Sequence, residues 1–240
     1  MFDEDFLQAV FDVPPVDSVS DMVTLLGDDE LDRSPVVANR AMNRERALTG
    51  VNSYARELGL DPAQWLLDRP EPGSWLDLCS GAGLALTAAA GRLPAATVLT
   101  GVDLVGPLGP RHVAPNVQLI VASLADWAPK QPYDLITCVH GLHYLGDKLG
   151  LLGRAAGWLS PDGLFAAQLD PVSLRRADGG SLAKPALAAL RAAGFEYQPR
   201  RHLLTLRGRR SVRLPFDYLG ADTTAGPNYT GQPAVASHYG

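Results

Sequence analysis

SWLDLCSGAGLAL, residues 74–86, predicts a buried strand that enters a helix through a glycine turn. A Gly-x-Gly turn at the carboxyl end of a strand leaves backbone N–H groups open to a ligand, because no Cβ blocks the approach. Asp77 lies on this strand, and Asp103 ends the next apolar run. A carboxylate at that place accepts hydrogen bonds from both hydroxyls of a ribose. The stretch therefore predicts a site for a ligand that contains a ribose.

Four further apolar runs follow, and helical stretches separate them. The runs predict strands at 97–103, 117–122, 133–139 and 164–170, with helices at 83–91, 147–158 and 181–193. This alternation predicts an α/β fold with a doubly wound, mostly parallel sheet. Residues 202–208 and 211–220 predict two more strands joined by a Gly-Arg-Arg turn, which form a C-terminal antiparallel hairpin at one edge.

The first 70 residues contain no predicted strand and indicate an N-terminal helical cap. Start and stop signals place helices from Ser34 to Gly50, from Asn52 to Gly59 and from Asp61 to Pro70. An apolar face in FLQAVF, residues 6–11, fits intrachain packing and a homodimer contact equally well. We therefore divide the chain into a cap or lid (1–70), a core (71–219) and a turn-rich tail (220–240).

Composition limits the classes of protein that fit. A chain of 240 residues with 46% hydrophobic residues suits one main core with an appendage. The N-terminus is acidic, where a signal peptide is basic, and no apolar run has the length of a membrane span. We therefore expect a cytoplasmic protein without a membrane partner.

The charge is unevenly distributed along the chain. The net charge is -5, yet residues 1–32 hold ten acidic residues and no basic ones, so the remaining 21 basic and 16 acidic residues give +5. This balance argues against a general nucleic-acid surface. The arginines within 200–213 either attract an acidic ligand or form a charged edge that discourages strand pairing.

Residues 81–86, GAGLAL, separate two classes of nucleotide site. A dinucleotide fingerprint needs a third glycine where this chain has Leu86, so NAD fits poorly. With Asp77 before the turn and Asp103 after the next strand, the stretch resembles the first motif of the class I, Rossmann-like S-adenosylmethionine (SAM) dependent methyltransferases. NVQLIVASLADW (116–127), YDLITCVHGLHYLGD (133–147) and WLSPDGLFAAQ (158–168) resemble later segments of the same family, over residues 74 to 219.

The resemblance implies SAM as cofactor and assigns residues to it. Two positions depart from the family pattern: Cys79 replaces the first motif glycine, and Ser123 stands where an aspartate usually binds the adenine amino group. A neutral serine accepts a weaker hydrogen bond than a carboxylate. The cofactor-binding residues that the resemblance implies are Asp77, Cys79, Gly81, Gly83, Asp103, Leu104, Ser123, Leu124 and His140.

The resemblance also suggests where the chemistry takes place. His143 follows the fourth strand, where the family places its substrate, and is the candidate general base because histidine titrates near neutral pH. The alternative is that His140 and His143 cap or pack the next helix; a metal site lacks carboxylate partners, so none is expected. Tyr54 is the candidate in the cap, to face the methyl group or the substrate, unless its helix is an ordinary surface helix.

These observations predict SAM-dependent methyl transfer to a small molecule, in specialised metabolism. Internal cyclisation of SAM and SAM binding without catalysis remain open. Cys79 and Cys138 form no disulfide framework, and we expect them to lie close together as thiols, because the resemblance makes their strands neighbours.

Overall fold

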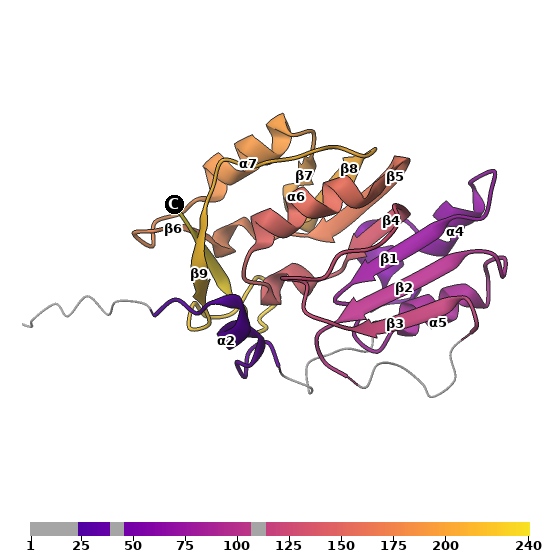
Figure 1. Cartoon of the computed structure of the whole chain (residues 1–240), viewed down its shortest axis with the longest axis horizontal. Coiled ribbons are helices and arrows are strands. Elements are labelled where there is room, and N and C mark those ends of the chain that lie inside the picture. The colour runs from indigo at the N-terminus through magenta and orange to yellow at the C-terminus, as the bar shows by residue number, and fades with distance from the viewer. Residues whose placement is uncertain (1–23, 39–45, 107–113) are drawn as a thin grey trace, which may run out of the picture.

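A computed structural model describes residues 24–38, 46–106 and 114–240 (Figure 1). Its main element is a seven-stranded sheet in the order β3-β2-β1-β4-β5-β8-β7. The first five strands in this order are parallel, and β8 runs antiparallel to both of its neighbours. The bounds are β1 Ser74–Leu78, β2 Val98–Asp103, β3 Val117–Val121, β4 Tyr133–Cys138, β5 Leu159–Gln168, β7 Glu196–Gln198 and β8 Leu203–Arg207.

The strand carrying Asp77 lies at the centre of the sheet. β1 pairs with β2 on one side and with β4 on the other, and Trp75, Leu76 and Leu78 have no exposed surface. The strand order reverses between β1 and β4, and ligands of open α/β sheets bind outside the carboxyl ends of strands at such a point. The five predicted parallel strands and the doubly wound fold are confirmed, although β5 begins five residues before its predicted start.

The predicted C-terminal hairpin joins the wrong strands, because β8 does not pair with residues 211–220. β8 pairs with β5 and with the three-residue β7, and residues 211–217 form no strand. Pro215 cannot donate a ladder hydrogen bond, which disfavours a strand at that position. The edge is therefore closed by a hairpin of β7 and β8, joined through the 3₁₀ turn Pro199–Arg201.

The tail, predicted to be a turn-rich segment, contains regular strands. β9 Tyr218–Asp222 and β10 Ala236–Tyr239 form a second sheet with β6 Leu174–Arg176, in the order β6-β10-β9. All four residues of β10 are buried. The tail is thus part of the folded body, because a strand this short is stabilised mainly by its burial.

The cap contains three short helices: α2 Asp28–Asp32, α3 Tyr54–Leu58 and α4 Pro62–Leu67. Gly59 and Asp61 cap α3 and α4 as predicted, but Ser53, not Asn52, accepts the N-terminal hydrogen bond of α3. The predicted helix from Ser34 to Gly50 is not observed in the described part of that range. Residues 35–37 form a turn, and Ala47 forms a bridge with Ser53. Residues 39–45 and 6–11 lie outside the described residues.

The remaining helices cover the sheet and follow the predicted ranges. They are α5 Leu84–Ala90, α6 Lys148–Trp158 and α7 Ala183–Ala192, with 3₁₀ turns at Gly141–Tyr144 and Pro171–Ser173. Asp147 caps α6 by accepting from the N–H of Gly150. Figure 1 shows α2, near the start of the described chain, beside β9, near its end, where Leu26 bridges Ala221.

Lys148 links the tail to the loop after β4 through hydrogen bonds. Its side chain has no exposed surface, and Nζ donates to the carbonyls of Leu145 and Val235 and to Oγ of Ser237 at 2.7–2.9 Å. The N–H of Val235 in turn donates to the carbonyl of His143 at 2.8 Å. Three acceptors match the three protons of an ammonium group, whereas burial lowers the pKa of Lys148 to about 7.

We predict that Lys148→Met destabilises the protein by an amount that depends on pH. The pKa of Lys148 is 10.5 in the unfolded state and about 7 in the folded state, so between these values the unfolded chain binds more protons and wild-type stability rises with pH. Because the variant lacks this dependence, its deficit in urea unfolding should widen as pH rises through that window, by up to about 1.4 kcal/mol per pH unit.

The exposed Lys130→Met variant is the control, and its difference from wild type should stay constant with pH. A deficit of Lys148→Met that does not change with pH would mean that the buried amine stays charged in the folded protein.

Candidate functional site

A cavity of about 280 Å³ opens at the carboxyl edge of the sheet, beside the point where the strand order reverses. One side is lined by the ends of β1, β2 and β3, through Cys79, Ser80, Gly81, Asp103, Leu104, Ser123 and Leu124. The other side is lined by the cap, the loop after β4 and the tail, through Arg46, Tyr54, His140, His143, Tyr144, Thr230 and Gln232. Every site residue that the sequence predicted lies in this lining except Asp77 and Gly83.

The turn after β1 has an unusual backbone. Cys79, Gly81 and Gly83 all have φ between 57° and 69°, in the left-handed region that favours glycine. A glycine, which the resembled motif has at the position of Cys79, adopts this conformation without strain. The N–H of Gly81 donates to Oδ2 of Asp103 at 2.8 Å, which ties the turn to the end of β2.

We predict that two substitutions of Cys79 differ in their effect on stability. Cys79→Gly relieves the positive φ, so it should keep the fold and the affinity for S-adenosylhomocysteine (SAH). Cys79→Val places a β-branched residue in the same conformation and should lower the free energy of unfolding by roughly 1–3 kcal/mol. Urea unfolding and calorimetric titration measure both effects, and equal stability of the two variants would contradict the explanation.

Gly83 has a packing role at the same turn. A Cβ at this position would approach Cδ2 of Leu119 to 2.7 Å, so the glycine allows α5 to lie close to β3. Asp77 also lies outside the lining. It has no exposed surface and accepts hydrogen bonds from the hydroxyls of Tyr54 and Thr137, both at 2.6 Å. Burial raises the pKa of Asp77 to about 7, although both hydrogen bonds oppose the rise.

Two buried polar groups in the lining lack a hydrogen-bond partner among the described residues. They are Oγ of Ser80, in the turn after β1, and both ring nitrogens of His143, in the loop after β4. Buried polar groups in folded proteins are nearly always paired, so each indicates a ligand or water partner. The sequence did not single out Ser80, although it lies inside the quoted motif.

The environment of His143 differs from the expectation. Its side chain is buried, and burial, followed by the nearby His140, Lys148 and His202, lowers its pKa to about 3. The expectation that it titrates near neutral pH is therefore corrected: His143 is a neutral imidazole over the physiological range.

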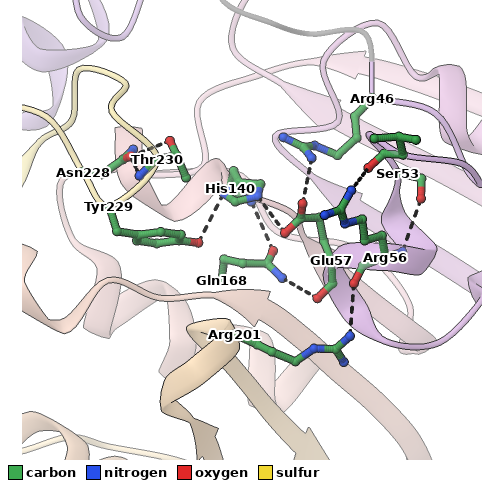
Figure 2. Close-up of polar contacts among 11 residues, drawn as sticks. Arg46, Ser53, Arg56, Glu57, His140, Gln168, Arg201, Asn228, Tyr229 and Thr230 are labelled. Atoms are coloured by element: carbon green, nitrogen blue, oxygen red, sulfur yellow. Dashed lines mark hydrogen bonds and ion pairs between the residues drawn. The ribbon is translucent and has the colours of Figure 1, made fainter.

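His140 has partners on several sides, as Figure 2 shows. Its Nε2 lies 3.1 Å from Oε2 of Glu57, on α3, and its Nδ1 lies 3.4 Å from the hydroxyl of Tyr229, in the tail. The Tyr229 ring stacks on His202, with ring centroids 3.8 Å apart. Sequence patterns do not single out Glu57 or Tyr229 as site residues, because their partners are distant in the chain.

The two cysteines lie together, as predicted, with Cys79 in the cavity lining and Cys138 buried. Both are free thiols, and Cys79 forms a hydrogen bond with Cys138 that, with burial, raises the pKa of Cys79. A Cβ on Gly141 would lie 2.7 Å from both sulfur atoms. In the described parts of the chain, no group of three or more potential metal ligands occurs, and no helix is long and apolar enough to cross a membrane.

The sequence profile of a family described as "Methyltransferase domain" matches residues 51–206. The chain belongs to this family. It is a class I SAM-dependent methyltransferase domain by fold and motif, and the family uses SAM as cofactor.

Among curated proteins, the chain is similar to trans-aconitate 2-methyltransferases. It is 34% identical to that of Escherichia fergusonii over 95 residues, which cover 39% of this chain and 37% of the relative. It is also 34% identical to that of Methylobacterium radiotolerans over 113 residues, which cover 45% and 43%. The chain thus matches less than half the length of these relatives.

Solved methyltransferases are similar over about half of the chain. The plantazolicin methyltransferase BpumL, in complex with a pentazolic desmethylPZN analogue and SAH, has 19% identity and a TM-score of 0.43, and the match covers 58% of this chain and 59% of that chain. The SAM-bound amino pentose methyltransferase CalS10 from Micromonospora echinaspora has 24% identity and a TM-score of 0.38, with 48% and 50% covered. The family assignment rests on the sequence profile.

Proposed function

We propose that this protein transfers a methyl group from SAM to a small-molecule acceptor bound in the same cavity. One observation carries the proposal: the motif turn and Asp103 form one wall of the cavity, and the rings of Tyr54, His140 and His143 form the facing wall. A cavity with one wall for the cofactor and another for the acceptor fits a reaction that depends on alignment of two molecules.

The residues on the cofactor side fit SAM. The carboxylate of Asp103 suits the ribose hydroxyls, Ser123 and the backbone of Leu124 suit the adenine edge, and the unpaired Oγ of Ser80 suits the polar amino-acid end. When bound, SAM supplies an electrophilic methyl group on a sulfonium. Asp77 would act indirectly, by holding Tyr54 at the cavity wall.

The facing side would bind and orient the acceptor. His143 remains uncharged, so its two unpaired nitrogens can donate to and accept from an acceptor without carrying charge. Such groups favour a second bound molecule over internal cyclisation of SAM. The curated relatives are named for trans-aconitate, a small organic acid, which supports a small acceptor. A role in specialised metabolism and a homodimer stay predictions.

We predict that Asp103→Ala weakens SAH binding about 10- to 100-fold, because the ribose hydroxyls lose a charged acceptor worth about 1.5–3 kcal/mol. Asp162→Ala is the matched control, since Asp162 is exposed at the opposite end of the sheet. Calorimetric titration measures both. An unchanged affinity in Asp103→Ala would contradict the proposed cofactor site.

The cap is proposed to close over the bound cofactor and exclude water. Tyr54 and Leu58 already pack in the core, so this arrangement of the cap should become more populated when SAH binds. Hydrogen exchange should show residues 46–58 gaining protection on addition of SAH. Equal protection with and without SAH, together with full activity of Tyr54→Phe, would contradict a lid role.

A further inference from the structure

Glu57, His140 and Tyr229 form a chain of polar contacts on the acceptor side of the cavity (Figure 2). The three residues come from α3 in the cap, the loop after β4 and the tail. His140 lies in the middle, with 15% of its side chain exposed, and lines the cavity. A carboxylate that contacts one ring nitrogen of a histidine leaves the other nitrogen available for proton transfer.

The contact with Glu57 fixes which nitrogen of His140 is basic. Since Oε2 of Glu57 is an acceptor, a neutral His140 donates from Nε2, and Nδ1 carries the lone pair. The 3.4 Å contact from Tyr229 to Nδ1 is too long to be a strong hydrogen bond, so an acceptor hydroxyl can displace it.

Buried Gln168 holds this pair in place. It has no exposed surface; its Nε2 donates to the carbonyl of Glu57 at 3.2 Å, and a weaker contact of 3.4 Å joins the backbone N–H of His140 to its Oε1. One side chain of β5 therefore positions both members of the pair, as Figure 2 shows. A supported pair of this kind keeps the geometry that proton transfer needs.

The two histidines of the site differ in their partners. His143 has no carboxylate beside it, and neighbouring groups disfavour its charged form. For His140, Glu57 opposes the lowering of the pKa by burial and by Arg46. Of the two rings, His140 is therefore the one built to take up a proton.

We propose that His140, paired with Glu57, is the general base of the methyl transfer, and that the acceptor is a hydroxyl compound such as a phenol or an alcohol. This inference rests on the proposed function and deepens it. The sequence had assigned His140 to the cofactor and the base to His143. An ionised carboxylate has no proton to lose, so methyl transfer to a carboxylate oxygen would leave this pair without a role.

The methyl transfer forms one oxygen–carbon bond and breaks one carbon–sulfur bond. The lone pair of the acceptor oxygen forms the bond to the methyl carbon, and the carbon–sulfur bond breaks with its electron pair going to sulfur. The proton of the hydroxyl passes to Nδ1 of His140. The resulting imidazolium is stabilised by the Glu57 carboxylate and releases the proton to solvent.

Charged and titratable groups face His140 from every element packed against it. Those that contact it or shift its pKa are Glu57, Arg46, His143, His202 and Tyr229. Arg46 also pairs with Oε1 of Glu57 at 3.3 Å, which limits the carboxylate's effect on the ring. Because the pKa of His140 is below its ordinary value of 6.5, the base is unprotonated at neutral pH.

The first test is an NMR titration of the histidine side chains in the SAH-loaded protein. Glu57→Gln removes the contribution that raises the pKa of His140, so the His140 titration should move to lower pH. Glu71→Gln, an exposed glutamate before β1, is the matched control and should leave His140 unchanged. An unshifted His140 in Glu57→Gln would overturn the proposal.

The second test uses 4-hydroxybenzoate, which carries a phenol and an ionised carboxylate in one molecule. Wild type with labelled SAM should form the ether and not the ester. His140→Asn should lose about 10²- to 10⁴-fold in rate. In Glu57→Gln, the acidic limb of the rate profile should move to lower pH with the NMR titration, because activity requires unprotonated His140.

Two results separate this inference from the function on which it rests. Formation of the methyl ester, with a rate insensitive to His140→Asn, overturns the base assignment and leaves methyl transfer intact. Failure of the wild-type protein to bind SAH in calorimetry rejects the proposed function itself, whatever the His140 titration shows.

Discussion

The buried carboxyl group of Asp77 holds the site together. It accepts hydrogen bonds from Tyr54 in the cap and from Thr137 on β4, so one group joins three segments at the point where the strand order reverses. An isolated charge in that place would be costly, and the two donors offset the cost only in part. The contact with Tyr54 links the cap to the centre of the sheet.

The cavity divides into walls of different chemistry because different parts of the fold form them. The carboxyl ends of β1, β2 and β3 supply backbone groups and the Asp103 carboxylate, which the sheet fixes rigidly. The facing wall comes from loops, the cap and the tail, which Lys148 and Gln168 hold through buried hydrogen bonds. Methyltransferases with one core can therefore accept different substrates by changing the second wall.

The sequence predicted the parts of the site whose signal is local. The apolar runs located the five parallel strands, and the glycine turn pointed to residues that line one side of the cavity. It missed contacts between distant segments: Glu57 and His140 are 83 positions apart, and Tyr229 and His140 are 89 positions apart. β7 and β10, of three and four residues, carry too short a pattern to be detected, which is why the edge hairpin and the tail were misassigned.

A crystal structure of the protein with SAH tests the central claim most directly. The account predicts the ribose on Asp103, the amino-acid end near Ser80, and the sulfur facing the space between Tyr54, His140 and His143. SAH bound outside this cavity, or with its sulfur turned away from the two histidines, would contradict the account.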